Sequence, residues 1–79
     1  MSRKVYVKVL SETDEEGNIS PLEVTWEDGR SYIIDKITDI RRAYAGKVGG
    51  TAMRYTVRIA GKETYIFTED GKWFVESKV

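Results

Sequence analysis

The chain has 79 residues, of which 41% are hydrophobic and 33% are charged, and its formal net charge is zero. This is a globular composition, and the length suits one domain with a small core. The chain contains no cysteine and no histidine, which excludes disulfides, thiol nucleophiles and the commonest metal ligands. No apolar run approaches the roughly 20 residues that span a bilayer, and no signal peptide is recognisable, so we expect a cytoplasmic protein.

Charged side chains are unevenly distributed along the chain. Residues 11–40 hold nine acidic and two basic side chains, whereas residues 41–62 hold six basic side chains and no acidic one. If the fold keeps these two blocks apart, the protein surface is dipolar.

An apolar residue at every second position is typical of a half-buried strand, and this pattern begins near the N-terminus. Valines alternate with polar residues over 3–10, and apolar residues alternate again over 21–26. The stretch between them, SETDEEGNIS (residues 11–20), is acidic and rich in turn formers, which predicts an exposed loop. We therefore expect two strands joined by this loop.

The dipeptide Asp28-Gly29 follows the second strand and is typical of a two-residue hairpin turn. A turn centred there would align Trp26 with Ser31, Val24 with Ile33, and Leu22 with Asp35. The next segment, SYIIDKITDIRR, places isoleucines at spacings that a helix also accepts. Because isoleucine and tyrosine favour strands, we expect a long strand with a bulge near Asp35–Lys36; a helix over 33–42 is the alternative.

The second half of the chain continues the strand pattern. We expect a glycine-rich loop over 43–52, a strictly alternating strand over 53–59, and a turn at 60–62 whose register stays open. A second Asp-Gly turn at 70–71 would pair Phe67 with Phe74 and Ile66 with Val75.

Both faces of this last hairpin are apolar. One face carries Tyr65, Phe67 and Phe74, and the other carries Ile66, Trp73 and Val75. A flat sheet packed on one side would leave one of these sets in water. We therefore predict that residues 1–79 form a single all-β domain. Seven aromatic side chains are expected in its core: Trp26, Tyr32, Tyr55, Tyr65, Phe67, Trp73 and Phe74. The expected form is a small antiparallel barrel or strongly curled sheet of five to six strands, of SH3-like or OB-like size.

Two loops resemble ligand-binding loops but lack the required spacing. The stretch RRAYAGKVGG (41–50) has glycines and cations, yet lacks the first glycine and the Ser or Thr after Gly-Lys that a phosphate-binding loop needs. The acidic loop TDEEGN (13–18) lacks the alternating acids of a calcium site. We therefore assign no cofactor and no metal, and expect a flexible connection and a solvated loop.

The basic block over 41–62 remains as a candidate site. Cations interleaved with aromatic side chains on a small barrel are typical of proteins that bind single-stranded nucleic acid. The alternative is that the arginines line a solvated or protein-contacting face and pair with acids on other strands. The candidate contact residues are Arg41, Arg42, Tyr44, Lys47, Arg54 and Arg58.

No combination of residues points to catalysis. In the absence of histidine and cysteine, the carboxylates, lysines, tyrosines and serines stand at no spacing that indicates a reaction. We therefore expect a non-catalytic interaction module that contacts a protein partner or self-associates as a homo-oligomer, with no role at a membrane. Weak binding of single-stranded nucleic acid through the basic segment is the alternative function.

Three stretches, PLEVTWEDGRSYIIDKI, MRYTVRIAG and DGKWFVE, carry a resemblance to small bacterial β domains of unassigned function. Those domains combine a Trp-x-x-Gly-Arg-x-Tyr hairpin with a later Tyr-x-Val strand and a terminal tryptophan. Some of them are similar to partners of DNA-damage-tolerance genes. The resemblance implies a β fold but supplies no activity and no site residues, and the acidic first loop has no counterpart in the pattern. The matching residues are Pro21, Trp26, Gly29, Arg30, Tyr32, Tyr55, Val57 and Trp73.

Overall fold

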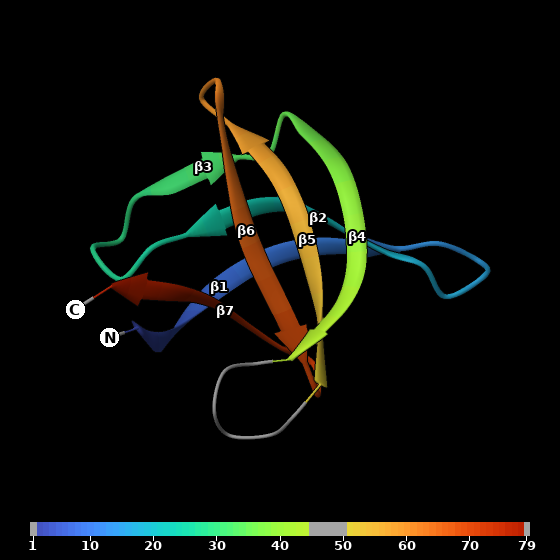
Figure 1. Ribbon diagram of the computed structural model, residues 1–79. Coiled ribbons are helices and arrows are strands. Elements are labelled where there is room, and N and C mark those ends of the chain that lie inside the picture. Colours follow the sequence, from blue (N-terminus) through green and yellow to red (C-terminus); the bar gives the residue numbers. More distant parts are fainter. Residues whose placement is uncertain (1, 45–50, 79) are drawn as a thin grey trace.

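The computed structural model describes the backbone of residues 2–44 and 51–78, and the side chains of residues 3–42 and 52–76 (Figure 1). The described residues form one antiparallel sheet of seven strands in the order β3-β2-β1-β7-β6-β5-β4. The strands are β1 (Ser2–Thr13), β2 (Ile19–Thr25), β3 (Ser31–Ile33), β4 (Lys36–Tyr44), β5 (Thr51–Ile59), β6 (Lys62–Glu69) and β7 (Lys72–Lys78). No helix of the described chain is long and apolar enough to cross a membrane.

The all-β fold predicted from the alternating pattern is confirmed, as a sheet that curls into a half-barrel (Figure 1). The segment from Ser31 to Tyr44 is extended rather than helical, and it divides into β3 and β4 at residues 34–35. The predicted bulge near Asp35–Lys36 therefore lies one residue from this break. A further register shift occurs between Ile37 and Asp39. The break accounts for a count of seven strands where five to six were expected.

The first loop is shorter than predicted. β1 extends to Thr13 and β2 begins at Ile19, so only residues 14–18 lie outside the strands. Asp14 organises this turn, because its Oδ1 accepts the N–H groups of Glu16 and Asn18, each at 2.9 Å. The hydrogen bond from the Asn18 backbone is the main cause that lowers the pKa of Asp14.

The predicted register of the β2–β3 hairpin is wrong by one residue. The Trp26 N–H donates to the carbonyl of Arg30 at 2.8 Å, and the Gly29 N–H donates to the carbonyl of Trp26 at 3.0 Å. The loop therefore has three residues, 27–29, and Gly29 is its left-handed residue, with φ of 86°. A type I turn followed by a left-handed glycine is the usual form of such a loop.

This extra loop residue reverses the faces of β3. Val24 lies opposite Tyr32, and Glu23 lies opposite Ile33. Tyr32 and Ile34 consequently pack against the inner core, whereas Ile33 points outward and is 70% exposed. The predicted pairing of Val24 with Ile33 would have produced the opposite arrangement.

The two later turns have two residues each. Ala60 and Gly61 have φ of 51° and 78°, as do Asp70 and Gly71, and such pairs of positive angles are typical of hairpin turns that match the sheet twist. The predicted pairing of Phe67 with Phe74 is confirmed. The ladder between β6 and β7 ends at that pair, however, so the predicted pairing of Ile66 with Val75 is not formed.

The core has an inner and an outer part, as the two apolar faces of the last hairpin require. On the concave side of the sheet, one cluster joins side chains from β2, β5, β6 and β7. On the outer side, Phe67 and Phe74 stack at 5.2 Å between ring centroids. Lys4 lies over the Phe74 ring at 4.8 Å, and the Tyr6 ring meets it edge-on. The inner cluster consists of Val24, Tyr55, Val57, Ile59, Ile66 and Trp73.

Tyr55 connects the inner cluster to the start of β2. Its ring lies 5.3 Å from that of Trp73, and its hydroxyl donates to the carbonyl of Ile19 at 3.1 Å. Burial raises the pKa of the Tyr55 hydroxyl. The aromatic core is thus largely as predicted, with one exception: Tyr65 lies on the outer face and is 48% exposed.

Candidate functional site

The sheet is split between β6 and β7. β6 pairs with β5 from Ile59–Lys62 to Met53–Thr68, whereas its ladder with β7 contains three pairs next to the turn. β7 pairs instead with β1 as far as Ser2–Lys78. The two strands therefore leave their shared turn in different directions, which Figure 1 shows as β6 and β7 running apart. We call the gap beyond Phe67 and Phe74 the seam.

Backbone polar groups face this seam. In an antiparallel ladder, alternate residues direct their N–H and C=O groups to opposite sides of the strand. The residues that flank each two-residue turn form a hydrogen-bonded pair, which sets the alternation along β6 and β7. By this rule Glu63 and Tyr65 on β6, and Glu76 on β7, direct their backbone groups into the seam. The structure forms no ladder pair between Tyr65 and Glu76.

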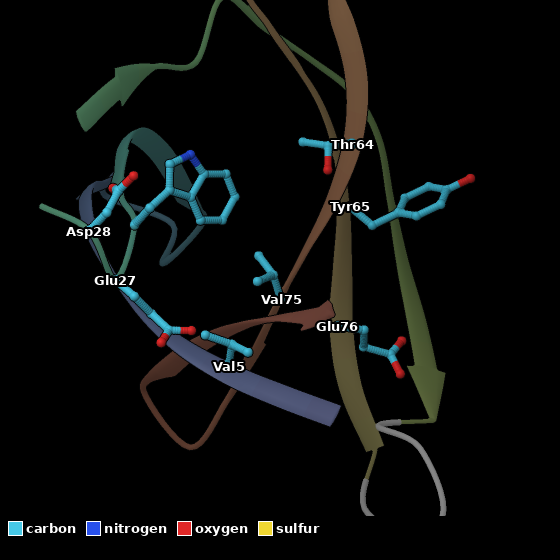
Figure 2. A pocket seen from close by; sticks show the side chains of 8 residues that line it. Val5, Glu27, Asp28, Thr64, Tyr65, Val75 and Glu76 are labelled. Carbon is cyan, nitrogen blue, oxygen red and sulfur yellow. The ribbon is translucent and has the colours of Figure 1, made fainter. Parts of the chain in front are cut away.

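A cavity of about 400 Å³ lies at the seam. In Figure 2, Val5 and Val75 lie in its middle, and the Thr64 side chain points from β6 toward the β2–β3 hairpin. The side chains of Tyr65 and Glu76 point away from the valines, toward the outer face (Figure 2). The lining residues are Val5, Trp26, Glu27, Asp28, Thr64, Tyr65, Val75 and Glu76.

The cavity combines an apolar floor with a negative rim. Three of its lining residues are acidic and none is basic. Two of the acids have weak partners at the surface: Glu27 lies 3.9 Å from Arg3, and Asp28 lies 3.7 Å from Arg30. Exposed ion pairs of this kind contribute little energy, so both carboxylates can accept another cation.

Three of the six predicted contact residues lie together on the outer face. Arg41 of β4 is the cross-strand neighbour of Arg54 of β5, and Arg58 follows Arg54 on the same face of β5. The guanidinium of Arg54 lies over the Tyr65 ring at 4.7 Å from its centroid. The Nε of Arg41 lies 2.7 Å from Asp39, an ion pair within β4 and not the pairing with acids on other strands that the alternative interpretation expected.

The other three predicted residues do not join this group. Arg42 lies opposite Met53, whose side chain packs against the inner cluster, so Arg42 belongs to the opposite face. Tyr44 ends β4 opposite Thr51, and its side chain is outside the described set. Lys47 lies outside the described residues. The register of β4 and β5, rather than proximity in sequence, decides which cations share a surface.

The acidic loop predicted to be solvated is exposed throughout. Within residues 2–44 and 51–78, no group of three or more acidic side chains is placed to hold a metal ion. The carboxylate of Asp14 stabilises the β1–β2 turn, since it also accepts a hydrogen bond from the Asn18 side chain at 3.1 Å.

Sequence reasoning missed the seam and its lining. The sequence pattern assigns Trp26 and Val75 to the core and Glu27 to a turn. Trp26 and Val75 do pack against the inner cluster, but all three residues also line the cavity. The separation of β6 from β7 has no local signal, because it follows from the different strands with which each one pairs. Comparisons with models of known protein families, with curated proteins and with solved structures found no match.

Proposed function

We propose that the protein is a non-catalytic interaction module whose seam binds an extended segment of a protein partner as an added strand. The observation that carries this proposal is the early end of the β6–β7 ladder, which leaves the edge of β6 open beside a cavity. An added strand gains its affinity from backbone hydrogen bonds and its specificity from pockets that accept alternate side chains. The proposal keeps the cytoplasmic location expected from the sequence.

The bound segment would pair with the open backbone groups of Glu63 and Tyr65. Each such hydrogen bond contributes a net stabilisation of about 1 kcal/mol, because water is displaced from both partners. A segment that makes a few of these bonds and fills one cavity binds weakly and reversibly. This is the behaviour of a module that works together with other contacts.

The cavity favours a lysine or arginine side chain on the bound segment. An aliphatic stem fits against Val5 and Val75, and the cation then lies near the carboxylates of Glu27 and Asp28. The indole of Trp26 offers the most favourable aromatic face for a cation. A glutamate at the same position would meet the carboxylates of Glu27 and Asp28 and would be repelled.

Capped pentapeptides serve as probes in an NMR titration. The sequence Ac-Thr-Val-Lys-Val-Thr-NH₂ is compared with its Lys-to-Glu version and with a version N-methylated at its second and third residues, which lacks an N–H on each edge. We expect the lysine peptide to shift the amide signals of Tyr65 and Glu76, and the other two peptides to leave them unchanged. Equal shifts with all three peptides, or shifts remote from the seam, would overturn the proposal.

A charge reversal tests the same site from the protein side. Glu27→Lys places a cation at the rim and is expected to weaken binding of the lysine peptide about tenfold, an amount equal to about 1.4 kcal/mol. Glu15→Lys is the matched control, because Glu15 lies in the exposed β1–β2 turn, at the opposite end of β2 from Glu27 (Figure 1). Identical affinities for the two variants would contradict the assigned position of the cation.

A second candidate function is weak binding of single-stranded nucleic acid by the outer face of β4–β6. The observation that favours it is the arrangement of Arg54 over the half-exposed Tyr65, with Arg41 and Arg58 beside it. A base can stack on such a tyrosine while the arginines contact phosphates. The Nε of Arg54 is buried and has no hydrogen-bond partner among the described residues, so the guanidinium is held mainly by the ring.

Titration with dT₁₂ and rU₁₂ at about 50 mM salt tests this second function, because binding through phosphates weakens steeply as salt rises. Arg41→Gln combined with Arg58→Gln is expected to reduce the affinity, whereas Glu27→Lys is expected not to. No shift of the Arg54 and Tyr65 signals at this salt would exclude it. Because the two sets of variants are different, the peptide and nucleic-acid functions can fail independently.

A further inference from the structure

The two edge strands of the sheet differ in how they resist pairing with another chain. β4 carries Lys36, Asp39, Arg41 and Arg42, and its register shifts at Thr38. Charges and bulges of this kind are the usual devices that prevent edge-to-edge association. β3 has the sequence Ser-Tyr-Ile, without a charge or a bulge. The short length of β3 is the only feature of this strand that opposes edge-to-edge association.

An exposed aliphatic surface lies directly beside the β3 edge. Leu10, Glu23 and Ile33 are neighbours across β1, β2 and β3, and they share the outer face. A register shift between Leu10 and Ser11 leaves Leu22 opposite no residue of β1. Leu10, Leu22 and Ile33 are 60%, 40% and 70% exposed. Leu10 and Ile33 lie in one row of the outer face, on either side of Glu23, and form a patch in contrast to single, scattered exposed residues.

The backbone of β3 is available on its free side. The Ile34 N–H donates to the carbonyl of Leu22, and Tyr32 is the paired residue two positions earlier. By the alternation of an antiparallel ladder, Ser31 and Ile33 therefore direct their N–H and C=O groups away from β2. These groups lie symmetrically on either side of Tyr32.

We infer that the free edge of β3 pairs with β3 of a second copy of this chain, in antiparallel orientation about a two-fold axis at Tyr32. Ser31 then exchanges backbone hydrogen bonds with the partner's Ile33, and the reverse pair forms by symmetry. A two-fold contact requires a surface that is complementary to itself, and the symmetric placement of these groups meets that requirement. The contact does not involve the seam and does not depend on the function proposed for it.

The charges that flank β3 favour this orientation. Arg30 precedes the strand and Asp35 follows it, and both side chains are exposed. In the antiparallel arrangement Arg30 approaches the partner's Asp35 at each end of the contact. In a parallel arrangement Arg30 would approach the partner's Arg30, and the like charges would repel.

The aliphatic surface becomes continuous in this dimer. Ile33 and the partner's Ile33 are diagonal neighbours on the outer face, where diagonal side chains of this size can touch. The surface that Leu10 and Ile33 form therefore meets its symmetry-related copy across the axis. Because β3 is short, we expect weak, reversible association that depends on concentration.

Sedimentation equilibrium over a concentration series up to about 1 mM measures this association directly. We expect a monomer–dimer equilibrium for the natural chain. Ser31→Pro removes an N–H that faces the free edge and leaves the backbone hydrogen bonds with β2 intact, although it also removes the hydrogen bond between the Ser31 and Thr25 hydroxyls. Proline is tolerated at such edge positions. Ser31→Pro should weaken dimerisation at least tenfold, as should Ile33→Lys. Ile40→Thr, which alters an exposed isoleucine on the other edge strand, is the matched control.

The outcomes separate the two proposals. A monomer at every concentration, or a dimer that Ser31→Pro and Ile33→Lys leave unchanged while both variants remain folded by NMR, would overturn the inference. If Glu27→Lys abolishes dimerisation and Ile33→Lys does not, the seam is the self-association site and the β3 contact is wrong. If dimerisation responds as expected and the lysine peptide does not bind, the seam proposal fails alone.

Discussion

Ile34 and Asp35 are adjacent in the chain, yet they donate their backbone N–H groups to two strands that lie far apart in the strand order of the sheet. Ile34 donates to Leu22 of β2 and Asp35 donates to Arg58 of β5, each at 2.9 Å. In the strand order, β2 and β5 are separated by β1, β7 and β6. Two successive peptide units thus join distant parts of the sheet and hold the curl on which the buried inner cluster depends. A chain that bends and changes partner is a common way to form such corners.

Asp35→Pro tests this join, because proline cannot donate the N–H that reaches Arg58. We expect a loss of about 1–3 kcal/mol in the free energy of unfolding, from the lost hydrogen bond and the unsatisfied carbonyl. Asp35→Ala keeps the N–H and changes only an exposed side chain, so it should stay within about 0.5 kcal/mol of the natural chain. Urea denaturation measures both. Equal losses in the two variants would show that the backbone bond does not hold the curl.

Gly29 tests the corrected hairpin register. Its φ of 86° lies in the left-handed region, and an added Cβ would meet no atom within 4 Å. Gly29→Ala should therefore lose about 1–2 kcal/mol from backbone strain alone. Gly29→Asn should lose less, because asparagine tolerates left-handed angles. If thermal or urea unfolding finds alanine as stable as asparagine, the three-residue loop is incorrect.

Tyr55→Phe removes the hydroxyl that donates to Ile19. We expect a loss of about 1 kcal/mol at neutral pH. Burial raises the pKa of Tyr55 above its ordinary value of 10.0, so the unfolded chain loses this proton first as pH rises. The stabilisation linked to this group is therefore present below that ordinary value and is lost as pH rises through the folded-state pKa. Unfolding followed between neutral and alkaline pH should show a steeper decline for the natural chain than for Tyr55→Phe.

The lowered pKa of Asp14 predicts that the stability of the fold depends on pH in the acidic range. The N–H of Asn18 is the main group that lowers the pKa of this carboxyl below its ordinary value of 3.8. Its contribution to stability is present above that value and is lost as pH falls through the folded-state pKa. A ¹³C NMR titration should find Asp14 titrating below a model-peptide aspartate. In Asp14→Ala the decline of stability with acid should be smaller, and an equal decline would remove Asp14 as a cause.

The local sequence pattern was sufficient to predict most of the strands and the register of one hairpin. The two Asp-Gly turns show that it is not sufficient to predict the length of a hairpin loop. Asp70-Gly71 forms a two-residue turn, whereas Asp28-Gly29 ends a three-residue loop. The dipeptide accepts both geometries, and packing decides, because only the observed register directs Tyr32 and Ile34 toward the inner cluster. The apolar faces of the last hairpin predicted a curled sheet, since Ile66 and Phe74 are both buried although they lie on opposite faces.

The candidate sites depended on relations that no short stretch of sequence contains. Arg41 and Arg54 became neighbours because a register shift at Thr38 aligns them, and the same shift placed Arg42 on the other face. The seam arises because β6 follows β5 while β7 follows β1. Its lining combines the β2–β3 hairpin with three other strands, so its parts are separated by up to most of the chain.

Amide hydrogen exchange tests the open seam most directly, because it reports each backbone N–H separately. An open seam requires strong protection for Phe67 and Phe74, which form the last pair of the β6–β7 ladder. It predicts fast exchange for Tyr65 and Glu76, the next positions along the two strands, although both lie within regular β structure. Protection of Tyr65 and Glu76 equal to that of Phe67 and Phe74 would mean that β6 and β7 pair beyond this point, and the seam would not exist.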